Sequence, residues 1–242
     1  MSEQVTINVD GSNMPSYLAR PKQTGPRPAV IVLQEIFGVN REVKRIADLV
    51  ASAGYVGLAI NYYHRTHPDL NAPYTPEGMQ QGFAAAGAVT KAGLLKDVAA
   101  AVAYLNGQDF VERGQVATWG FCFGGSVAFL SATLPEIKAA IAFYGGQIGA
   151  PFPSGEASAL QDVVSLKAPV LAVFGENDDF IPHAQIESIR SAVAAAPVPV
   201  RVVTYEGVGH AFFRESSAQL DAPAVADAWK RTQEFLRQAF GS

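Results

Sequence analysis

The sequence predicts an α/β fold in which helices cover both faces of a mostly parallel sheet, within a single domain of 242 residues. Three observations lead to this prediction. Short runs rich in β-branched residues alternate with longer segments of helical periodicity, which is typical of βαβ units. Several of the short runs are apolar throughout, as strands covered on both faces must be. Apolar residues make up 49% of the chain and charged residues 17%, which is enough to form one large core.

Eight segments are predicted to be strands, at residues 5–9, 16–20, 29–33, 55–61, 116–119, 139–144, 169–174 and 200–205. The first two flank a turn-forming Asp-Gly-Ser-Asn sequence, so we expect them to form an antiparallel hairpin. The third, Ala-Val-Ile-Val-Leu, is the first strand expected to be buried on both faces, and a loop over residues 34–40 follows it. A long polar loop with prolines is expected from residue 62 to about residue 78, and its length favours a function or mobility.

Five helices are predicted, at about residues 41–52, 90–105, 126–133, 183–196 and from about residue 223 onward. The first has apolar residues on one stripe and is followed by Gly54, a C-terminal stop signal. Thr90 can cap the second helix. The last begins near Pro223, a favourable first-turn residue, and keeps apolar residues at helical spacing as far as Ala239.

Charge and hydropathy exclude several classes of protein. Lys and Arg number 18 and Asp and Glu number 22, so the formal net charge is 18 − 22 = −4, with no basic cluster of the kind that binds nucleic acid. The longest apolar run, residues 98–105, is far shorter than the roughly 18 residues of a spanning helix. The first ten residues include Glu3 and Asp10 and show no secretory signal sequence, so we expect a cytoplasmic protein. We expect it to be a monomer or a small homo-oligomer.

The only cysteine of the chain lies in Gly120-Phe121-Cys122-Phe123-Gly124, between the strand at 116–119 and the helix at 126–133. This is the context of a nucleophile elbow, the sharp turn that carries the nucleophile of α/β-hydrolases. Such a turn strains the backbone, and larger side chains two positions before or after the nucleophile would collide with nearby backbone. The segment predicts a reactive thiol at Cys122, and the alternative is an inert buried cysteine.

A nucleophilic thiol needs a base and a group that orients the base, and in this fold an acid and then a histidine follow the nucleophile. Asp178 and Asp179 follow the strand at 169–174, at the edge where α/β sheets build their sites. His210 follows the strand at 200–205, between small residues. We expect His210 to take the thiol proton and Asp178 to orient its ring, with Asp179 as the alternative.

Four segments of the chain resemble the signature segments of the dienelactone hydrolase family, in the same order and spacing. They are Gln34-Glu35-Ile36-Phe37-Gly38-Val39-Asn40, Gly120-Phe121-Cys122-Phe123-Gly124-Gly125, Gly175-Glu176-Asn177-Asp178-Asp179-Phe180-Ile181-Pro182 and Gly209-His210-Ala211-Phe212-Phe213-Arg214. The resemblance covers nearly the whole length, and the first segment is its most specific part. It implies an α/β-hydrolase fold and a Cys122–His210–Asp178 triad. It also implies an oxyanion hole made by the backbone N–H groups of Ile36 and Phe123, which agrees with the usual geometry of an elbow.

The resemblance assigns further roles to Glu35 and Arg214. A carboxylate close to a thiol opposes formation of the thiolate. By similarity, Glu35 keeps the resting thiol neutral until substrate entry moves the carboxylate toward Arg214. The alternative is a resting pair of Cys122 thiolate and His210 imidazolium. Arg214 resembles the arginine that also binds the carboxylate of the family's anionic substrate.

A second arginine of the family pattern is missing from this sequence. Met79-Gln80-Gln81-Gly82-Phe83 stands in its place. Arg65 in the preceding loop could substitute for it, although a solvated loop arginine is the simpler interpretation. We therefore do not expect dienelactone itself to be the natural substrate.

Aromatic residues in or beside the loops that should face the thiol predict an apolar pocket, with core positions as the alternative. These residues are Phe37, Phe83, Phe123, Tyr144, Phe212 and Phe213. Tyr144 is included among the substrate-binding side chains. His64 and His67 are expected to be solvent-exposed loop residues rather than metal ligands, and the sequence calls for no cofactor.

The sequence as a whole predicts a hydrolase that opens lactones or activated carboxylic esters by way of a thioester on Cys122. The expected partner is a small-molecule ester or lactone. Two alternatives stay open: hydrolysis of another activated ester such as a neutral phosphotriester, and a thiol protein with a redox or ligand-binding role on a hydrolase scaffold.

Overall fold

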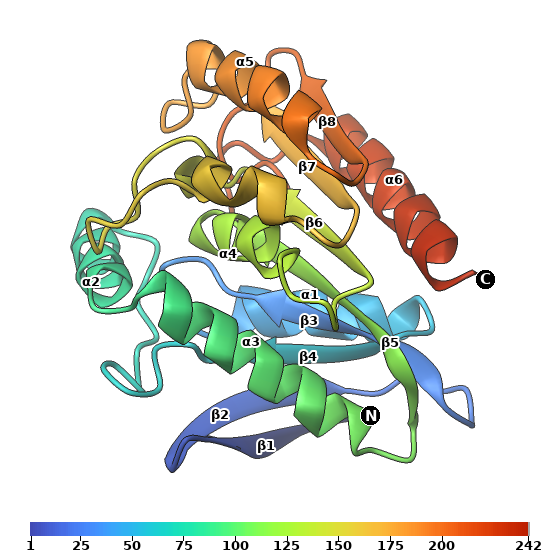
Figure 1. Ribbon diagram of the computed structural model, residues 1–242. Helices are drawn as coiled ribbons and strands as arrows, with labels where there is room; N and C mark the ends of the chain where they lie inside the picture. The colour runs from blue at the N-terminus through green and yellow to red at the C-terminus, as the bar shows by residue number, and fades with distance from the viewer. Residues whose placement is uncertain (242) are drawn as a thin grey trace.

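The computed structural model describes residues 1–241 and contains one eight-stranded sheet in the order β1-β2-β4-β3-β5-β6-β7-β8 (Figure 1). Its strands are β1 (Ser2–Val9), β2 (Ser12–Ala19), β3 (Arg27–Leu33), β4 (Val56–Ile60), β5 (Val111–Phe121), β6 (Ala139–Phe143), β7 (Val170–Gly175) and β8 (Val200–Tyr205). β2 pairs antiparallel with β1 and with β4. The remaining neighbours are parallel, so the predicted fold class is confirmed.

Helices lie on both faces of this sheet. They are α1 (Arg41–Ser52), α2 (Pro76–Gly87), α3 (Lys91–Asn106), α4 (Phe123–Ser131), α5 (His183–Ala192) and α6 (Ala222–Phe240), with short 3₁₀ turns at Gly146–Ile148, Ala159–Ser165 and Val193–Ala195. Thr118 of β5 hydrogen-bonds Ser131 of α4 at 2.9 Å, whereas its neighbour Trp119 stacks on Trp229 of α6. Because successive strand residues point to opposite faces, α4 and α6 cover opposite faces. Figure 1 shows α3 and α4 in front of the sheet, with α1 and α6 behind it.

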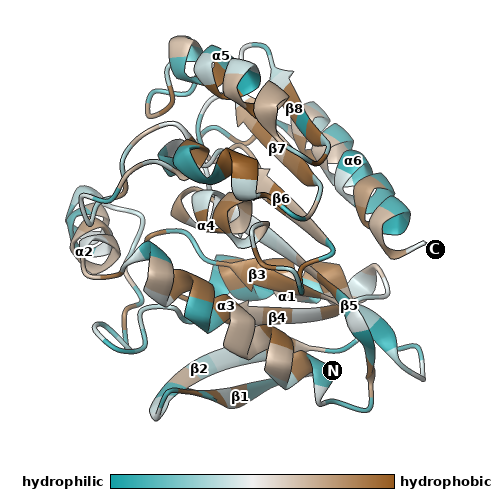
Figure 2. Cartoon of the chain, in the orientation of Figure 1, coloured by the Kyte–Doolittle hydropathy of each residue, from teal (hydrophilic) through white to brown (hydrophobic). Residues whose placement is uncertain are grey.

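The core lies in and against the central strands. Every residue of β4, β6 and β7 is buried, as their continuous apolar sequences predict. Figure 2 shows the same strands as largely hydrophobic, while hydrophilic residues lie on turns of α5 and α6. The strand ends that carry the loops are thereby held in a rigid frame.

One helix, α2, was not predicted, since the long loop was expected to run to about residue 78. Thr75 caps it by accepting from the Gly78 N–H at 3.2 Å, and Pro76 occupies the first turn. Its buried residues are all small, namely Gly78, Gly82, Ala85 and Ala86. No stripe of large apolar residues therefore marks the buried face in the sequence.

Several other boundaries differ from the prediction. β5 begins at Val111 rather than at residue 116, and β2 begins at Ser12 rather than at residue 16. α4 begins at Phe123, directly after the turn, rather than at residue 126. α5 ends at Ala192 and continues as a 3₁₀ turn, whereas one helix was expected to residue 196. Within the described residues, no helix is both long and apolar enough to cross a membrane.

Candidate active site

Cys122 occupies the turn between β5 and α4. Its backbone has φ 54° and ψ −121°, a conformation that is strained for any residue with a side chain. The Cys122 N–H donates to the Phe143 carbonyl at 3.0 Å, and the Cys122 carbonyl accepts from the Gly125 N–H at 2.9 Å. These bonds hold the turn in place, and the Cys122 residue is partly exposed.

The glycines on either side of Cys122 are required by close backbone contacts. A Cβ at Gly120 would lie 1.8 Å from the Gly124 carbonyl oxygen, and a Cβ at Gly124 would lie 2.3 Å from that of Leu33. No side chain fits at such distances. The steric requirement for glycine that was predicted at both positions is confirmed.

His210 and Asp178 come together from the loops that follow β8 and β7. His210 Nδ1 lies 2.7 Å from Asp178 Oδ2. The other carboxylate oxygen, Oδ1, accepts from the backbone N–H groups of Phe180 at 2.8 Å and Ile181 at 3.1 Å. The Asp178 side chain is fully buried, whereas its neighbour Asp179 is exposed. Of the two aspartates left open by the sequence, Asp178 is the one that pairs with His210.

The His210 ring favours its charged form. Burial opposes the positive charge, but the adjacent Cys122 sulfur and the Asp178 carboxylate outweigh this effect and raise the pKa of His210 to about 10. Cys122 contributes through both its charge and a hydrogen bond. Both neighbours favour the imidazolium over the neutral ring.

We expect the Cε1–H NMR signal of His210 to titrate well above the usual histidine value of about 6.5. In Cys122→Ala the midpoint should move to lower pH, because the influence of Cys122 that raises the pKa of His210 is lost. The chain has 4 histidines, so a His210→Gln variant assigns the signal. A midpoint near 6.5 in both the wild type and Cys122→Ala would contradict the raised pKa of His210.

Glu35 and Arg214 form a largely buried ion pair at the edge of the site. Glu35 Oε2 lies 3.4 Å from Arg214 Nη1, and the Glu35 side chain is only 4% exposed. Burial raises the pKa of the Glu35 carboxyl, while the charges of Arg214 and His210 work in the other direction. The carboxylate thus faces Arg214, the position that the family resemblance associates with substrate entry.

Tyr74 completes this group and was not predicted from the sequence. Its ring lies 4.0 Å from the Arg214 guanidinium carbon, and its hydroxyl accepts from Asn40 Nδ2 at 2.9 Å. It also hydrogen-bonds Glu35. The Thr75-Pro76 pair is the sequence signal that could have pointed to Tyr74. A capping threonine followed by a proline marks the start of a helix, and Tyr74 lies directly before it.

These side chains surround a pocket of about 330 Å³, within the size range of small-molecule sites. It is lined by Glu35, Ile36, Phe37, Tyr74, Met79, Phe83, Cys122, Gly146, Gln147, Asp179, Phe180, His210, Ala211, Arg214, Ser217, Ala218 and Gln219. Cys122, His210, Glu35 and Arg214 thus share one cavity, with Asp178 behind His210. Met79 and Phe83, at the two ends of the segment where the resemblance expects an arginine, also line the pocket.

The aromatic prediction was right for only two residues, Phe37 and Phe83. Tyr144, expected to bind substrate, is 1% exposed and lies beneath the site, with its ring centroid 5.1 Å from that of His210. The side chains of Phe123, Phe212 and Phe213 are also buried outside the pocket lining. The reason is that a residue beside an active-site loop often points into the core that supports the loop. Phe180 lines the pocket but was not among the predicted aromatic residues.

The two amides expected to form an oxyanion hole belong to segments at the pocket. Ile36 follows β3 and lines the cavity, and Phe123 is the first residue of α4. The first N–H groups of a helix have no partner within it. In the part of the chain that the structure describes, neither N–H donates to a protein acceptor.

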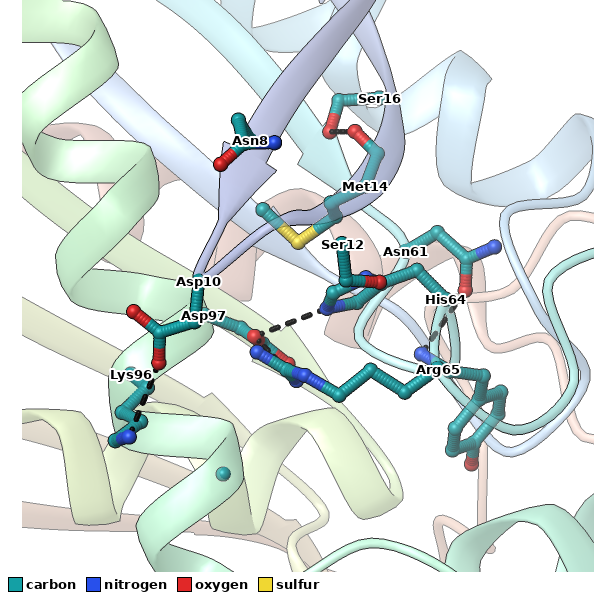
Figure 3. A network of polar contacts seen from close by, with 12 residues as sticks. Asn8, Asp10, Ser12, Met14, Ser16, Asn61, His64, Arg65, Lys96 and Asp97 are labelled. Carbon is teal, nitrogen blue, oxygen red and sulfur yellow. Dashed lines mark hydrogen bonds and ion pairs between the residues drawn. The ribbon is translucent and has the colours of Figure 1, made fainter.

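Arg65 and His64 do not belong to the site, and the expectation that His64 is solvent-exposed was wrong. His64 is buried, with Nε2 3.1 Å from Asp97 Oδ1 and Nδ1 3.0 Å from Ser12 Oγ (Figure 3). Arg65 Nη1 donates to the same Asp97 oxygen at 2.8 Å. The cluster joins the β1–β2 hairpin, the loop after β4 and α3, so Arg65 is occupied as a structural partner. It does not replace the missing arginine.

Residues 14–240 match the dienelactone hydrolase family. A Synechocystis sp. protein named "Putative carboxymethylenebutenolidase" is 35% identical over 233 residues, which cover 96% of this chain and 95% of that protein. A protein of the same name from Escherichia coli is 35% identical over 240 residues, 98% of this chain and 86% of its own.

Solved structures agree with these sequence matches. The crystal structure titled "Putative Dienelactone Hydrolase" from Klebsiella pneumoniae superposes with a TM-score of 0.89 at 30% identity and covers 98% of each chain. A dienelactone hydrolase-like promiscuous phosphotriesterase from metagenomic libraries has a TM-score of 0.79 at 22% identity over 99% of this chain and 98% of its own, a likeness of fold. The resemblance of the four sequence segments is therefore confirmed, and the chain belongs to the dienelactone hydrolase family.

Proposed function

We propose that this protein hydrolyses lactones or activated carboxylic esters, with Cys122 as nucleophile, His210 as general acid and base, and Asp178 as the group that orients His210. One observation carries the proposal. The strained turn presents Cys122 in the same pocket as a His210 ring that is held by Asp178 at 2.7 Å. Membership in a hydrolase family supports the same class of reaction.

In the first half of the reaction, Cys122 Sγ gives its proton to His210 and attacks the carbonyl carbon, and the carbonyl π electrons move to oxygen. The N–H groups of Ile36 and Phe123 donate to this oxyanion. Its collapse breaks the bond between carbon and the leaving oxygen, which takes the proton of the His210 imidazolium. The product is a thioester on Cys122.

In the second half, His210 removes a proton from water as the water oxygen attacks the thioester carbon. The tetrahedral adduct expels the Cys122 thiolate, and His210 keeps the proton, so the thiolate and imidazolium that attacked the substrate are restored. Asp178 holds the imidazole in the tautomer whose Nε2 can accept a proton throughout.

This chemistry favours substrates with good leaving groups. A thiolate leaves more readily than an alkoxide, so an adduct with a simple alkoxide tends to fall back to substrate. Enol and phenol leaving groups escape this limit. We therefore propose lactones of enols and aryl esters as substrates, with slow turnover of amides and simple alkyl esters.

A second candidate function is hydrolysis of neutral phosphotriesters. The phosphotriesterase neighbour shares the fold, and in this chain the Arg214 charge is already paired with Glu35. The same nucleophile would then attack phosphorus instead of carbon. A panel containing both aryl esters and aryl phosphotriesters separates the two candidates.

The proposal is tested by acid-quenching the enzyme during turnover of an aryl acetate and measuring its intact mass. We expect an added acetyl group that peptide mapping places on Cys122, with more adduct in His210→Gln when the ester is highly activated, because the thioester then lacks its base. Cys122→Ala should carry no adduct. Steady turnover by Cys122→Ala, or an acyl group on another residue, would overturn the proposal. Stoichiometric peroxide oxidation of Cys122 without any ester turnover would favour the redox alternative.

A further inference from the structure

The charged side chains around the pocket disfavour an anionic substrate. Arg214 is the only Lys or Arg in the described pocket lining, and its charge is paired with buried Glu35 and covered by the Tyr74 ring. Asp179 adds an exposed negative charge at the mouth. A positive charge on His210 is balanced by the Asp178 carboxylate, 2.7 Å away. The pocket thus has a negative rather than a positive balance, and a cavity with this potential repels anions.

Exposed aromatic side chains gather at the same mouth. Six large hydrophobic residues are exposed in the described chain, and three of them line this pocket: Tyr74 at 37%, Phe83 at 43% and Phe180 at 54%. They come from three separate segments, the loop before α2, α2 itself and the loop after β7. Exposed apolar side chains that gather in one place mark an interaction site, whereas scattered ones do not.

The aromatic mouth lies next to the reacting groups. The Phe180 ring centroid is 5.0 Å from the His210 ring centroid, so this side chain borders the base. The helix that carries Phe83, α2, approaches the Ile36 loop closely. A Cβ at Gly82 would lie 2.8 Å from the Ile36 carbonyl oxygen. Phe83 is thereby fixed beside the loop that carries one proposed oxyanion donor. A group bound between these segments is near the scissile bond.

We propose that the substrate is a neutral ester whose flat aromatic or conjugated part packs against Phe83, Phe180 and Tyr74, and that a carboxylate on this part lowers turnover. Aromatic rings supply large apolar area and favour contact with another ring. The inference rests on the proposed function, because it names the substrate class of the same site.

The test compares two aryl acetates that differ in one substituent, 4-acetoxybenzamide and 4-acetoxybenzoate. Each kcat/KM is divided by the rate constant of hydroxide hydrolysis, which removes the difference in leaving-group quality. We expect the normalised kcat/KM of the neutral amide to exceed that of the carboxylate at least about tenfold at low salt. The ratio should decrease as ionic strength rises, because salt screens the charge effect.

Two substitutions at the mouth sharpen the test. Phe83→Lys places a cation beside the bound ring and should shift the amide-to-carboxylate ratio at least about tenfold toward the carboxylate. Phe83→Ala should raise KM for the neutral amide several-fold, with a smaller change in kcat. The matched control is Val164→Lys, the same change of charge at a residue that is 66% exposed and outside the pocket lining. Its ratio should equal that of the wild type.

The outcomes separate this inference from the proposed function. Faster normalised hydrolysis of the carboxylate by the wild type, or an unchanged ratio in folded Phe83→Lys, would overturn the neutral aromatic substrate class and leave the hydrolase proposal standing. Hydrolysis of neither ester, or hydrolysis that persists in Cys122→Ala, would overturn both.

Discussion

Replacing Cys122 with alanine is expected to lower kcat for an activated aryl ester at least about 10⁴-fold, the scale seen when a nucleophile is removed from a catalytic triad. The proposed reaction has no other route to a covalent intermediate. Any residual rate enhancement in Cys122→Ala would come from the oxyanion donors and from substrate binding alone. The measurement is a steady-state assay with enough enzyme to detect the residual rate above the uncatalysed reaction.

Alanine at position 122 tests the role of the sulfur itself, because it removes the sulfur but keeps a Cβ at the strained φ of 54°. The variant should fold, since the turn depends on backbone bonds to Phe143 and Gly125 rather than on the sulfur. Circular dichroism and thermal melting provide the check on folding. A folded variant with kcat within tenfold of wild type would show that Cys122 is not the nucleophile.

Asp178→Asn is expected to lower kcat on the order of 10³–10⁴-fold with little loss of fold. Asp178 Oδ1 accepts two backbone N–H bonds, from Phe180 and Ile181, and only an oxygen can serve them. The asparagine NH₂ must then face His210 Nδ1. This forces the proton of the neutral ring onto Nε2, which faces away from the acid and can no longer accept a proton from water or thiol.

The control for this variant is Glu176→Gln, which removes a carboxylate from the same turn but outside the pocket lining. Its kcat should stay within about twofold of wild type. The pH dependence of kcat/KM adds an independent readout, because the limb that reports His210 should move to lower pH in Asp178→Asn as a raising influence on the pKa of His210 is lost. Equal activity of Asp178→Asn and wild type would remove Asp178 from the mechanism.

The sequence was a good guide wherever one physical cause acts on neighbouring residues. The apolar runs of β3, β6 and β7 predicted buried parallel strands, because a strand covered on both faces admits little else. The glycines around Cys122 predicted the sharp turn for a steric reason that the backbone distances confirm. Motif order was also informative for His210 and Asp178, because parallel strands deliver their loops to one edge of the sheet.

The sequence was a poor guide where the path of a loop or the direction of a side chain decides the outcome. Tyr74 reaches the site only because the loop after β4 returns through α2, a helix whose small buried residues leave no periodic signal. Tyr144 directly follows β6, at the edge of the sheet where the site lies, but its side chain is buried in the core. His64 looked like a loop histidine, yet Asp97, 33 positions away, holds it buried. None of these three placements follows from local pattern.

The glycines of α2 have a consequence for how related chains could differ in selectivity. Gly78 and Gly82 let the helix backbone approach Pro73 and Ile36, with hypothetical Cβ distances of 1.9 and 2.8 Å to their carbonyl oxygens. A larger residue at either position would force α2 and the Pro73 or Ile36 backbone apart, and a shift of the helix would carry Met79 and Phe83 with it. The width of the pocket therefore depends on two buried positions of α2 that are not part of its lining. A related chain with the same lining residues could therefore accept larger substrates because of a substitution at one of these two glycines.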